Sequence, residues 1–244
     1  VLFLNTRFLQ GGGAEKQTKL NIQALIESDT EYDIYVGFGN GYDEKERAEL
    51  DSMGVRVKVF SMLRHYNPMT QIVALARVTQ FLRKENIDII HTRGTEASVL
   101  GKIAARIAKT PIMIHGVRGV PFGKHQSVLF NKFLINLERL TDRFAIVRVA
   151  DSSVTRTKYI ENGVGKSGVF KIINPGIDVS KYRNATPAEV ETNSESIVLF
   201  VGRLEKNKGV LDLIHAFENV HENHDAELLL VGEGVLENEI KAIV

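Results

Sequence analysis

Short apolar runs alternate along this chain with longer segments in which apolar residues recur at helical spacing. The apolar runs predict strands, and the amphipathic segments between them predict helices. Strands separated by such helices favour right-handed crossovers and therefore a parallel sheet with helices on both faces. The strands predicted in the first part of the chain cover residues 1–5, 32–39, 55–60, 87–94, 111–119 and 144–149.

Individual helices can be placed by their apolar faces and their end signals. Residues 69–86 predict a helix that buries one apolar side. Ser152 or Ser153 is expected to cap the helix that begins near residue 153, and Gly163 is expected to end it in a left-handed conformation. The residues expected on the buried side of the helix at 69–86 are Ile72, Val73, Leu75, Ala76, Phe81 and Leu82.

A change of composition divides the chain into two domains. Residues 171–196 hold two of the five prolines and few large apolar residues, which is typical of a connection. We therefore predict a first Rossmann-like domain over 1–173, a linker over 174–195 and the start of a second domain over 196–244. Only two strand patterns follow the linker, and a two-stranded parallel ribbon cannot bury both of its faces. We expect this second domain to be incomplete in the sequence given.

Composition narrows the class of protein. Lys and Arg together number 31 against 30 for Asp and Glu, so the net charge gives no reason to expect a nucleic-acid partner. The absence of Cys excludes disulfides, thiolate metal sites and a cysteine nucleophile. With no run of apolar residues long enough to span a membrane, the sequence predicts a cytoplasmic protein.

A glycine-rich loop, GGGAE at 11–15, lies between the first predicted strand and its helix. Backbone N–H groups at such a turn can bind an anion. Gly11 and Gly13 match two glycines of the dinucleotide fingerprint, but Lys16 occupies the third position. No acidic residue for a ribose follows the second strand either. A tight turn and a phosphate-binding loop both remain open from the spacing alone.

A second glycine signal, GVGKSG at 163–168, resembles the end of a Walker A motif. Ile160 stands where the first glycine of that motif belongs. The loop also follows a predicted helix instead of a strand. Both departures argue against a nucleotide-binding P-loop here.

A third signal, VGRLEKNKG at 201–209, concentrates positive charge at the end of an apolar strand. Arg203 follows Gly202 directly, and Lys208 precedes a glycine that leads into a helix. A guanidinium, an ammonium and free helix N–H groups at one place suit a diphosphate. A solvated basic loop is the alternative.

Taken together, five motifs resemble the GT-B-fold, retaining glycosyltransferases of family 4. The resemblance extends over nearly the whole chain, and the VGRL and LLLVGEG motifs are its most specific part. It implies two facing Rossmann-like domains, a nucleotide-diphosphate sugar donor bound mainly by the second, and a glycan or lipid-linked acceptor bound mainly by the first. It also implies no cofactor and no obligatory metal. The matching motifs are GGGAE (11–15), IHG (114–116), NPGID (174–178), VGRLEKNKG (201–209) and LLLVGEGVLENEI (228–240).

The resemblance assigns roles by position. Arg203 and Lys208 fall where the family neutralises the donor diphosphate, and Gly12 and Gly13 where the backbone approaches phosphates or acceptor. His115 falls on the family's active-site histidine, although a lone histidine is more often a structural hydrogen-bonding group. Further contacts with donor or acceptor are expected from Glu15, Arg118 and Glu233, the last of which could instead cap a helix.

The chain departs from the family pattern in two places. Pro175 stands where Asn-Gly is more usual, which changes the local turn. The family's E-x7-E segment, which contacts the donor sugar and ribose, would lie beyond Val244, so we expect the 244-residue chain alone to be inactive. Three functions remain: a transferase in polysaccharide or lipopolysaccharide biosynthesis, a nucleotide-sugar-binding module without turnover, and another GT-B enzyme such as a sugar-nucleotide epimerase.

One further helix, predicted at 127–140, is both apolar and basic. It suggests either core packing, which we favour, or contact with the inner face of a membrane. Its apolar residues are Val128, Leu129, Phe133, Leu137 and Leu140, and the basic residues around them are Lys124, Lys132, Arg139 and Arg143.

Overall fold

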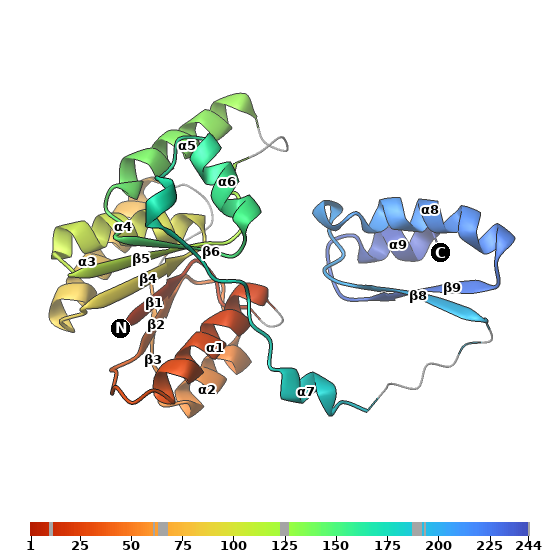
Figure 1. Ribbon diagram of the computed structural model, residues 1–244, viewed down its shortest axis with the longest axis horizontal. Coiled ribbons are helices and arrows are strands. Elements are labelled where there is room, and N and C mark those ends of the chain that lie inside the picture. The colour runs from red at the N-terminus through yellow and green to blue at the C-terminus, as the bar shows by residue number, and fades with distance from the viewer. Residues whose placement is uncertain are drawn as a thin grey trace. The chain divides into compact units, whose positions relative to one another are not determined.

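The computed structural model describes residues 1–9, 12–60, 62, 68–122, 127–186, 192 and 194–243. The chain forms two compact units, Val1–Ile177 and Asp178–Val244 (Figure 1). The boundary lies inside the segment predicted as a linker. The predicted α/β fold with parallel sheets is confirmed.

The first unit is built on a seven-stranded sheet in the order β3-β2-β1-β4-β5-β6-β7, in which all neighbours are parallel. The strand order reverses between β1 and β4. The connections that follow these two strands run over opposite faces of the sheet, an arrangement that forms a ligand-binding crevice at the carboxyl edge of α/β sheets. The strands are β1 (Leu2–Asn5), β2 (Tyr35–Phe38), β3 (Arg56–Val59), β4 (Ile89–Arg93), β5 (Ile112–Val117), β6 (Val147–Ala150) and β7 (Phe170–Ile172).

Helices cover the two faces of this sheet in separate layers, as Figure 1 shows. Alternate residues of β1 point to opposite faces, so that Leu2 and Leu4 join the core under α3 and α4, whereas Phe3 joins the core under α1 and α2. The helices of the first unit are α1 (Gly13–Ile26), α2 (Glu44–Ser52), α3 (Pro68–Lys84), α4 (Thr95–Ala108), α5 (Val128–Asp142) and α6 (Ser153–Glu161).

The end signals of α6 are confirmed. Ser152 caps it by accepting a hydrogen bond from the Thr155 N–H, and Gly163 has a φ of 67°. The loop at 163–168 leads from α6 into β7 and therefore lies at the amino edge of the sheet. A P-loop would need the carboxyl edge, so this geometry removes that alternative.

The predicted face of α3 is right at one end and wrong at the other. Leu82 is buried, and Leu75 and Phe81 pack against the core, as predicted. Ile72, Val73 and Ala76 are exposed, and the helix buries Ala74 and Val78 in their place. Apolar residues occupy nearly the whole circumference of this helix, so periodicity alone could not choose the buried side. Two elements were also missed, β7 and the short helix α7 (Val179–Arg183), because both lie in the segment interpreted as a connection.

The second unit pairs β8 (Ser196–Val201) with β9 (Ala226–Val231) in parallel. Helices α8 (Val210–Asn223) and α9 (Glu237–Ile243) pack on this ribbon around a small core. That core consists of Leu204, Val210, Ile214, Leu236 and Ile240. Several apolar side chains of β8 remain exposed, among them Leu199 and Val201.

Candidate active site

The glycine-rich loop of the first unit positions the start of α1. Gly12 is the N-cap residue, and no side chain caps this helix. A Cβ on Gly12 would lie 1.9 Å from Glu15 Oε2, whereas a Cβ on Gly13 would meet nothing within 4 Å. Glu15 is buried and accepts a hydrogen bond from the Leu9 N–H at 3.3 Å. Gly12 is thus needed for packing, and Gly13 presents an open backbone; Gly11 lies outside the described residues.

Arg118 joins this loop to the end of β5. Its Nη1 donates a hydrogen bond to the Gly13 carbonyl at 3.1 Å. Burial lowers the pKa of its guanidinium, against the opposing effect of Asp151 and Glu15 nearby. The two motifs are separated by about a hundred residues of sequence, and the carboxyl edge of the sheet brings them together.

His115 lines a polar pocket of about 170 Å³ at the same edge. The imidazole is buried, and its Nδ1 has no hydrogen-bond partner among the described residues. This nitrogen is open to a ligand in the pocket, so the active-site role of His115 stays a prediction beside the structural one. Around His115 the pocket is formed by Gly94, Thr95, Ser98, Gly116, Val117, Arg118, Gly119, Val120, Pro121, Glu138 and Tyr159.

The surroundings of His115 keep its imidazole neutral. Burial is the largest influence that holds its pKa well below 6.5, and the charges of Lys102 and Arg148 act in the same direction. A neutral imidazole offers one N–H donor and one acceptor nitrogen. Such a group suits a hydroxyl, which can donate and accept, better than it suits an anion.

A dependence of stability on pH follows from this histidine and His91, whose pKa is also held well below 6.5, first by burial and then by Arg93 and Arg118. Below pH 6.5 the unfolded chain binds protons that the folded chain does not, so the free energy of unfolding should fall as pH decreases. Each histidine contributes a slope of about 1.4 kcal/mol per pH unit. Urea unfolding between pH 7.5 and 5 measures this slope, and His115→Gln should reduce it; an unchanged slope would contradict a depressed pKa.

Several site residues were not predicted from the sequence. Ser98 lies one turn into α4, and its Oγ is buried in the described structure without a partner. Glu138 of α5 and Tyr159 of α6 complete the pocket from the far side. The turn HTRG before α4, a strand followed by glycine and a helix, was the signal that could have identified Ser98.

Arg93 was also missed. It is buried at the end of β4, where its Nη1 donates to Thr18 Oγ1 at 2.8 Å. Burial, with a contribution from Arg118, lowers the pKa of its guanidinium to about 9. This edge of the first unit therefore carries two cations, and neither forms an ion pair with a described carboxylate.

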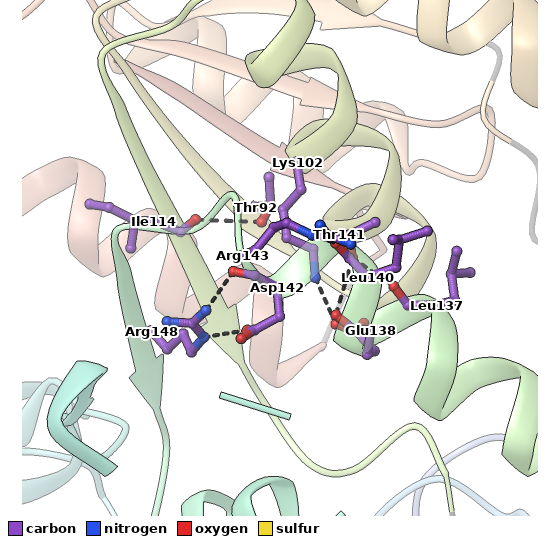
Figure 2. A network of polar contacts seen from close by, with 10 residues as sticks. All are labelled: Thr92, Lys102, Ile114, Leu137, Glu138, Leu140, Thr141, Asp142, Arg143 and Arg148. Atoms are coloured by element: carbon purple, nitrogen blue, oxygen red, sulfur yellow. Dashed lines mark hydrogen bonds and ion pairs between the residues drawn. The ribbon is translucent and has the colours of Figure 1, made fainter. Parts of the chain in front are cut away.

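Two buried ion pairs hold α5 in place, and one of them contains the pocket residue Glu138 (Figure 2). Lys102 Nζ and Glu138 Oε2 are 2.6 Å apart, and both side chains are almost wholly buried. Asp142 pairs with Arg148, whose guanidinium also donates to the Asp142 carbonyl. These pairs join α4, α5 and β6, so the buried charges next to the pocket neutralise one another.

The second unit presents its cations at the carboxyl edge of β8. Arg203 follows the strand, and Lys208 ends a short 3₁₀ turn before Gly209, whose φ of 70° starts α8. No side chain caps α8. Arg203 Nη1 lies 2.7 Å from Glu205 Oε1, and both cations are exposed. The predicted sequence of strand, basic turn and helix is confirmed.

The loops after β8 and β9 are interlocked, in the sense that backbone hydrogen bonds join them to each other. The Leu204 N–H donates to the Glu233 carbonyl at 2.9 Å, and the Leu236 N–H donates to the Leu204 carbonyl at 3.0 Å. A Cβ on Gly232 would lie 1.8 Å from the Gly202 carbonyl oxygen, so only glycine permits this approach. Glu233 is exposed on the loop beside Arg203. The VGR and VGEG motifs therefore lie side by side at the carboxyl edge of β8 and β9.

The predicted site residues therefore form two groups. Within the first unit, Gly12 and Gly13 lie beside Arg118, and His115 shares a pocket with Arg118. Within the second unit, Arg203, Lys208 and Glu233 lie on the two interlocked loops. Every one of these residues is at or near a carboxyl edge, where α/β sheets bind ligands.

Comparison with known protein families identifies both units. Residues 11–181 match the model described as Glycosyltransferase Family 4, and residues 183–244 match that of glycosyl transferases group 1. The two matches meet close to the structural boundary.

Two curated proteins similar to this chain are named as glycosyltransferases. The chain is 29% identical over 197 residues to UDP-Gal:alpha-D-GlcNAc-diphosphoundecaprenol alpha-1,3-galactosyltransferase of Escherichia coli, covering 74% of this chain and 49% of that protein. It is 26% identical over 209 residues to the capsular polysaccharide biosynthesis glycosyltransferase CapM of Staphylococcus aureus, covering 81% and 54%. The chain thus spans about half the length of these relatives.

Solved structures show the same fold. The crystal structure of Anabaena HepE in complex with UDP and glucose matches with a TM-score of 0.71 and 23% identity, over 99% of this chain and 64% of that one. The apo form of the lipopolysaccharide outer core galactosyltransferase WaaB matches with a TM-score of 0.64 and 14% identity, over 99% and 63%. Together with the family match over most of the first unit, these findings show that the chain belongs to glycosyltransferase family 4.

Proposed function

We propose that the protein transfers a sugar from a nucleotide-diphosphate donor to a hydroxyl of a glycan or lipid-linked acceptor, with retention of anomeric configuration. The observation that carries this proposal is the cationic turn of the second unit, where Arg203 and Lys208 precede the start of α8, which no side chain caps. The relatives named for transfer from UDP-galactose and for capsular polysaccharide biosynthesis support it.

The departing nucleoside diphosphate gains negative charge as the glycosidic bond breaks. Fixed cations that face this charge lower the barrier, because they need no reorganisation at the moment of reaction. We assign that task to Arg203 and Lys208, with the free N–H groups of α8 as further donors. Since these groups supply the positive charge, the proposal requires no metal ion and no cofactor. We assign Glu233, on the interlocked loop, to a contact with the donor sugar.

The pocket of the first unit suits a sugar hydroxyl. His115 has a neutral ring with an unsatisfied nitrogen, and Ser98 has an unsatisfied hydroxyl in the same pocket. We therefore assign His115 to the reacting centre and Ser98 to hydroxyl recognition. Gly12 and Gly13 would let phosphate or acceptor approach the backbone, while Glu15 and Arg118 hold that loop in place.

The expected place of reaction is the cytoplasm, at the inner face of the membrane when the acceptor is lipid-linked. Among the described residues, no helix is both long and apolar enough to cross a bilayer. We propose that a lipid-linked acceptor is reached by peripheral contact. The name of the Escherichia coli relative, with its diphosphoundecaprenol acceptor, makes a polyprenyl diphosphate the first acceptor to test.

A transfer assay with the intact protein tests this function. UDP-sugars, UDP-galactose first, are incubated with a polyprenyl-diphosphate-linked sugar, and the product is analysed by mass spectrometry and NMR. We expect transfer only when both substrates are present, with an α-linked product from an α-linked donor. Epimerised donor without acceptor would indicate an epimerase, and donor binding without any product would indicate a binding module; an inverted linkage would overturn retention alone.

A further inference from the structure

Helix α5 leaves a wide apolar surface uncovered on the first unit. Leu129 is 84% exposed, Val128 71% and Leu140 54%, although each is a large apolar residue. The expectation that this helix packs its apolar side into the core is therefore wrong. Its buried side instead holds Leu134 together with polar residues. Scattered apolar residues are common on surfaces, but several on one helix need an explanation.

The charges of α5 are sorted between the interior and the surface. Its two acidic residues, Glu138 and Asp142, point inward, where Lys102 and Arg148 neutralise them (Figure 2). The charged residues that remain exposed on the helix and its C-cap are Lys132, Arg139 and Arg143. All three are basic, and none forms an ion pair with a described carboxylate. Lys124 lies outside the described residues.

Helical spacing separates these residues into two adjacent strips. Leu129, Phe133 and Leu140 follow one another at four and seven residues, which keeps them on one side of the helix. Lys132, Arg139 and Arg143 follow at seven and four residues, on the neighbouring side. The exposed surface of α5 is therefore half apolar and half basic, and it contains no exposed acidic residue.

The apolar strip continues onto α3. Leu137 of α5 lines a groove of about 210 Å³ with apolar residues of α3 and α4, among them Ile72 and Leu100, and Gln71 and Glu96 are its polar lining residues. Ile72 is itself 63% exposed, and it is one of the residues that periodicity placed in the core. We call the exposed residues of α5, together with this groove, the α5 surface.

We propose that the α5 surface docks on an anionic lipid bilayer, with its apolar strip in the interface and its basic strip on the headgroups. An interfacial helix needs this combination of an apolar side and basic residues. A second copy of the chain would instead bring the same positive charge against itself. The inference deepens the proposed function, because it places the first unit where a lipid-linked acceptor lies, but its test requires no turnover.

The test is sedimentation of the intact protein with vesicles of phosphatidylcholine alone or with 30 mol% phosphatidylglycerol, at a fixed ionic strength. Binding is expected only with the anionic vesicles. Lys132→Gln with Arg143→Gln should weaken it by about fivefold for each charge removed, or about 25-fold in all. Leu129→Ser with Leu140→Ser should weaken it at least about tenfold, because apolar area no longer enters the interface.

Matched controls come from the opposite sheet face. Lys45→Gln on α2 and Ile26→Ser on α1 remove an exposed charge and an exposed apolar group there, and should bind like the original protein. Circular dichroism confirms that each variant is folded. Equal binding by all variants, or no binding to anionic vesicles, overturns the proposal. A concentration-dependent dimer that the leucine variant dissociates would overturn it in favour of a second copy. If vesicle binding fails while transfer to a water-soluble acceptor persists, the membrane proposal is overturned and the proposed function is retained.

Discussion

Replacing Arg203 and Lys208 together with alanine is expected to lower kcat/KM for sugar transfer by at least about a thousandfold. Removal of one group that stabilises developing charge typically costs about 10²–10³ in rate, and we propose that two cations face the same leaving group. The loss should fall mainly on kcat, because the diphosphate gains charge only as the bond breaks. The melting temperature should hardly change, since both side chains are exposed.

The control for this variant is Lys206→Ala. Lys206 lies on the same 3₁₀ turn and is also exposed, but the proposal assigns it no contact with the diphosphate. The fold-decrease in kcat/KM caused by Lys206→Ala should be at least about a hundred times smaller than that caused by the double substitution. If the double variant keeps its turnover, or if Lys206→Ala is equally damaging, the assignment of Arg203 and Lys208 is wrong.

The ion pair between Arg203 and Glu205 does not conflict with this role. Both partners are partly exposed, and such surface pairs contribute about 0–1 kcal/mol. Exchange of Glu205 for a diphosphate therefore costs little.

The second large effect concerns stability. Glu138→Ala should lower the free energy of unfolding by about 3–5 kcal/mol, because it leaves the Lys102 ammonium buried without its partner. Lys102 Nζ and Glu138 Oε2 are 2.6 Å apart, and their side chains are 0% and 2% exposed. Figure 2 shows this pair between α4 and α5. Urea unfolding followed by circular dichroism measures the change.

Two comparisons separate this effect from a general loss of packing. Lys102→Met with Glu138→Leu removes both charges, and it should recover most of the lost stability because apolar residues of similar volume often replace a buried pair without penalty. Glu49→Ala removes the exposed partner of Lys19 in the same unit and should cost less than about 1 kcal/mol. A Glu138→Ala protein as stable as the Glu49→Ala protein would contradict the account of the buried pair.

Sequence alone predicted the elements whose signals are local. Six of the seven strands of the first unit's sheet appear as short apolar runs, and Gly163 and Ser152 mark helix ends by the backbone chemistry of a single turn. The basic turn at Arg203 was found in the same way, because its strand, its glycines and its helix are contiguous. Such features depend on neighbouring residues only.

What sequence could not predict depends on contacts between distant segments. From the sequence, Glu138 would be predicted as a surface acid of an amphipathic helix. Only the ion pair with Lys102 of α4 offsets the free-energy cost of burying its charge. The exposed side of α5 was misplaced for the same reason, since Glu138 and Asp142 point inward whereas Leu129 and Leu140 are exposed. The contact between Arg118 and Gly13 joins residues that only the sheet order brings together.

Isothermal titration of UDP into the intact protein tests most directly whether the turn at Arg203 and Lys208 binds the donor diphosphate. The account predicts measurable binding to the original protein and at least about a hundredfold weaker binding to the double alanine variant, since two charge-assisted contacts are lost. The Lys206→Ala protein should bind UDP almost as tightly as the original. Equal affinity of the original and the double variant for UDP would contradict the account.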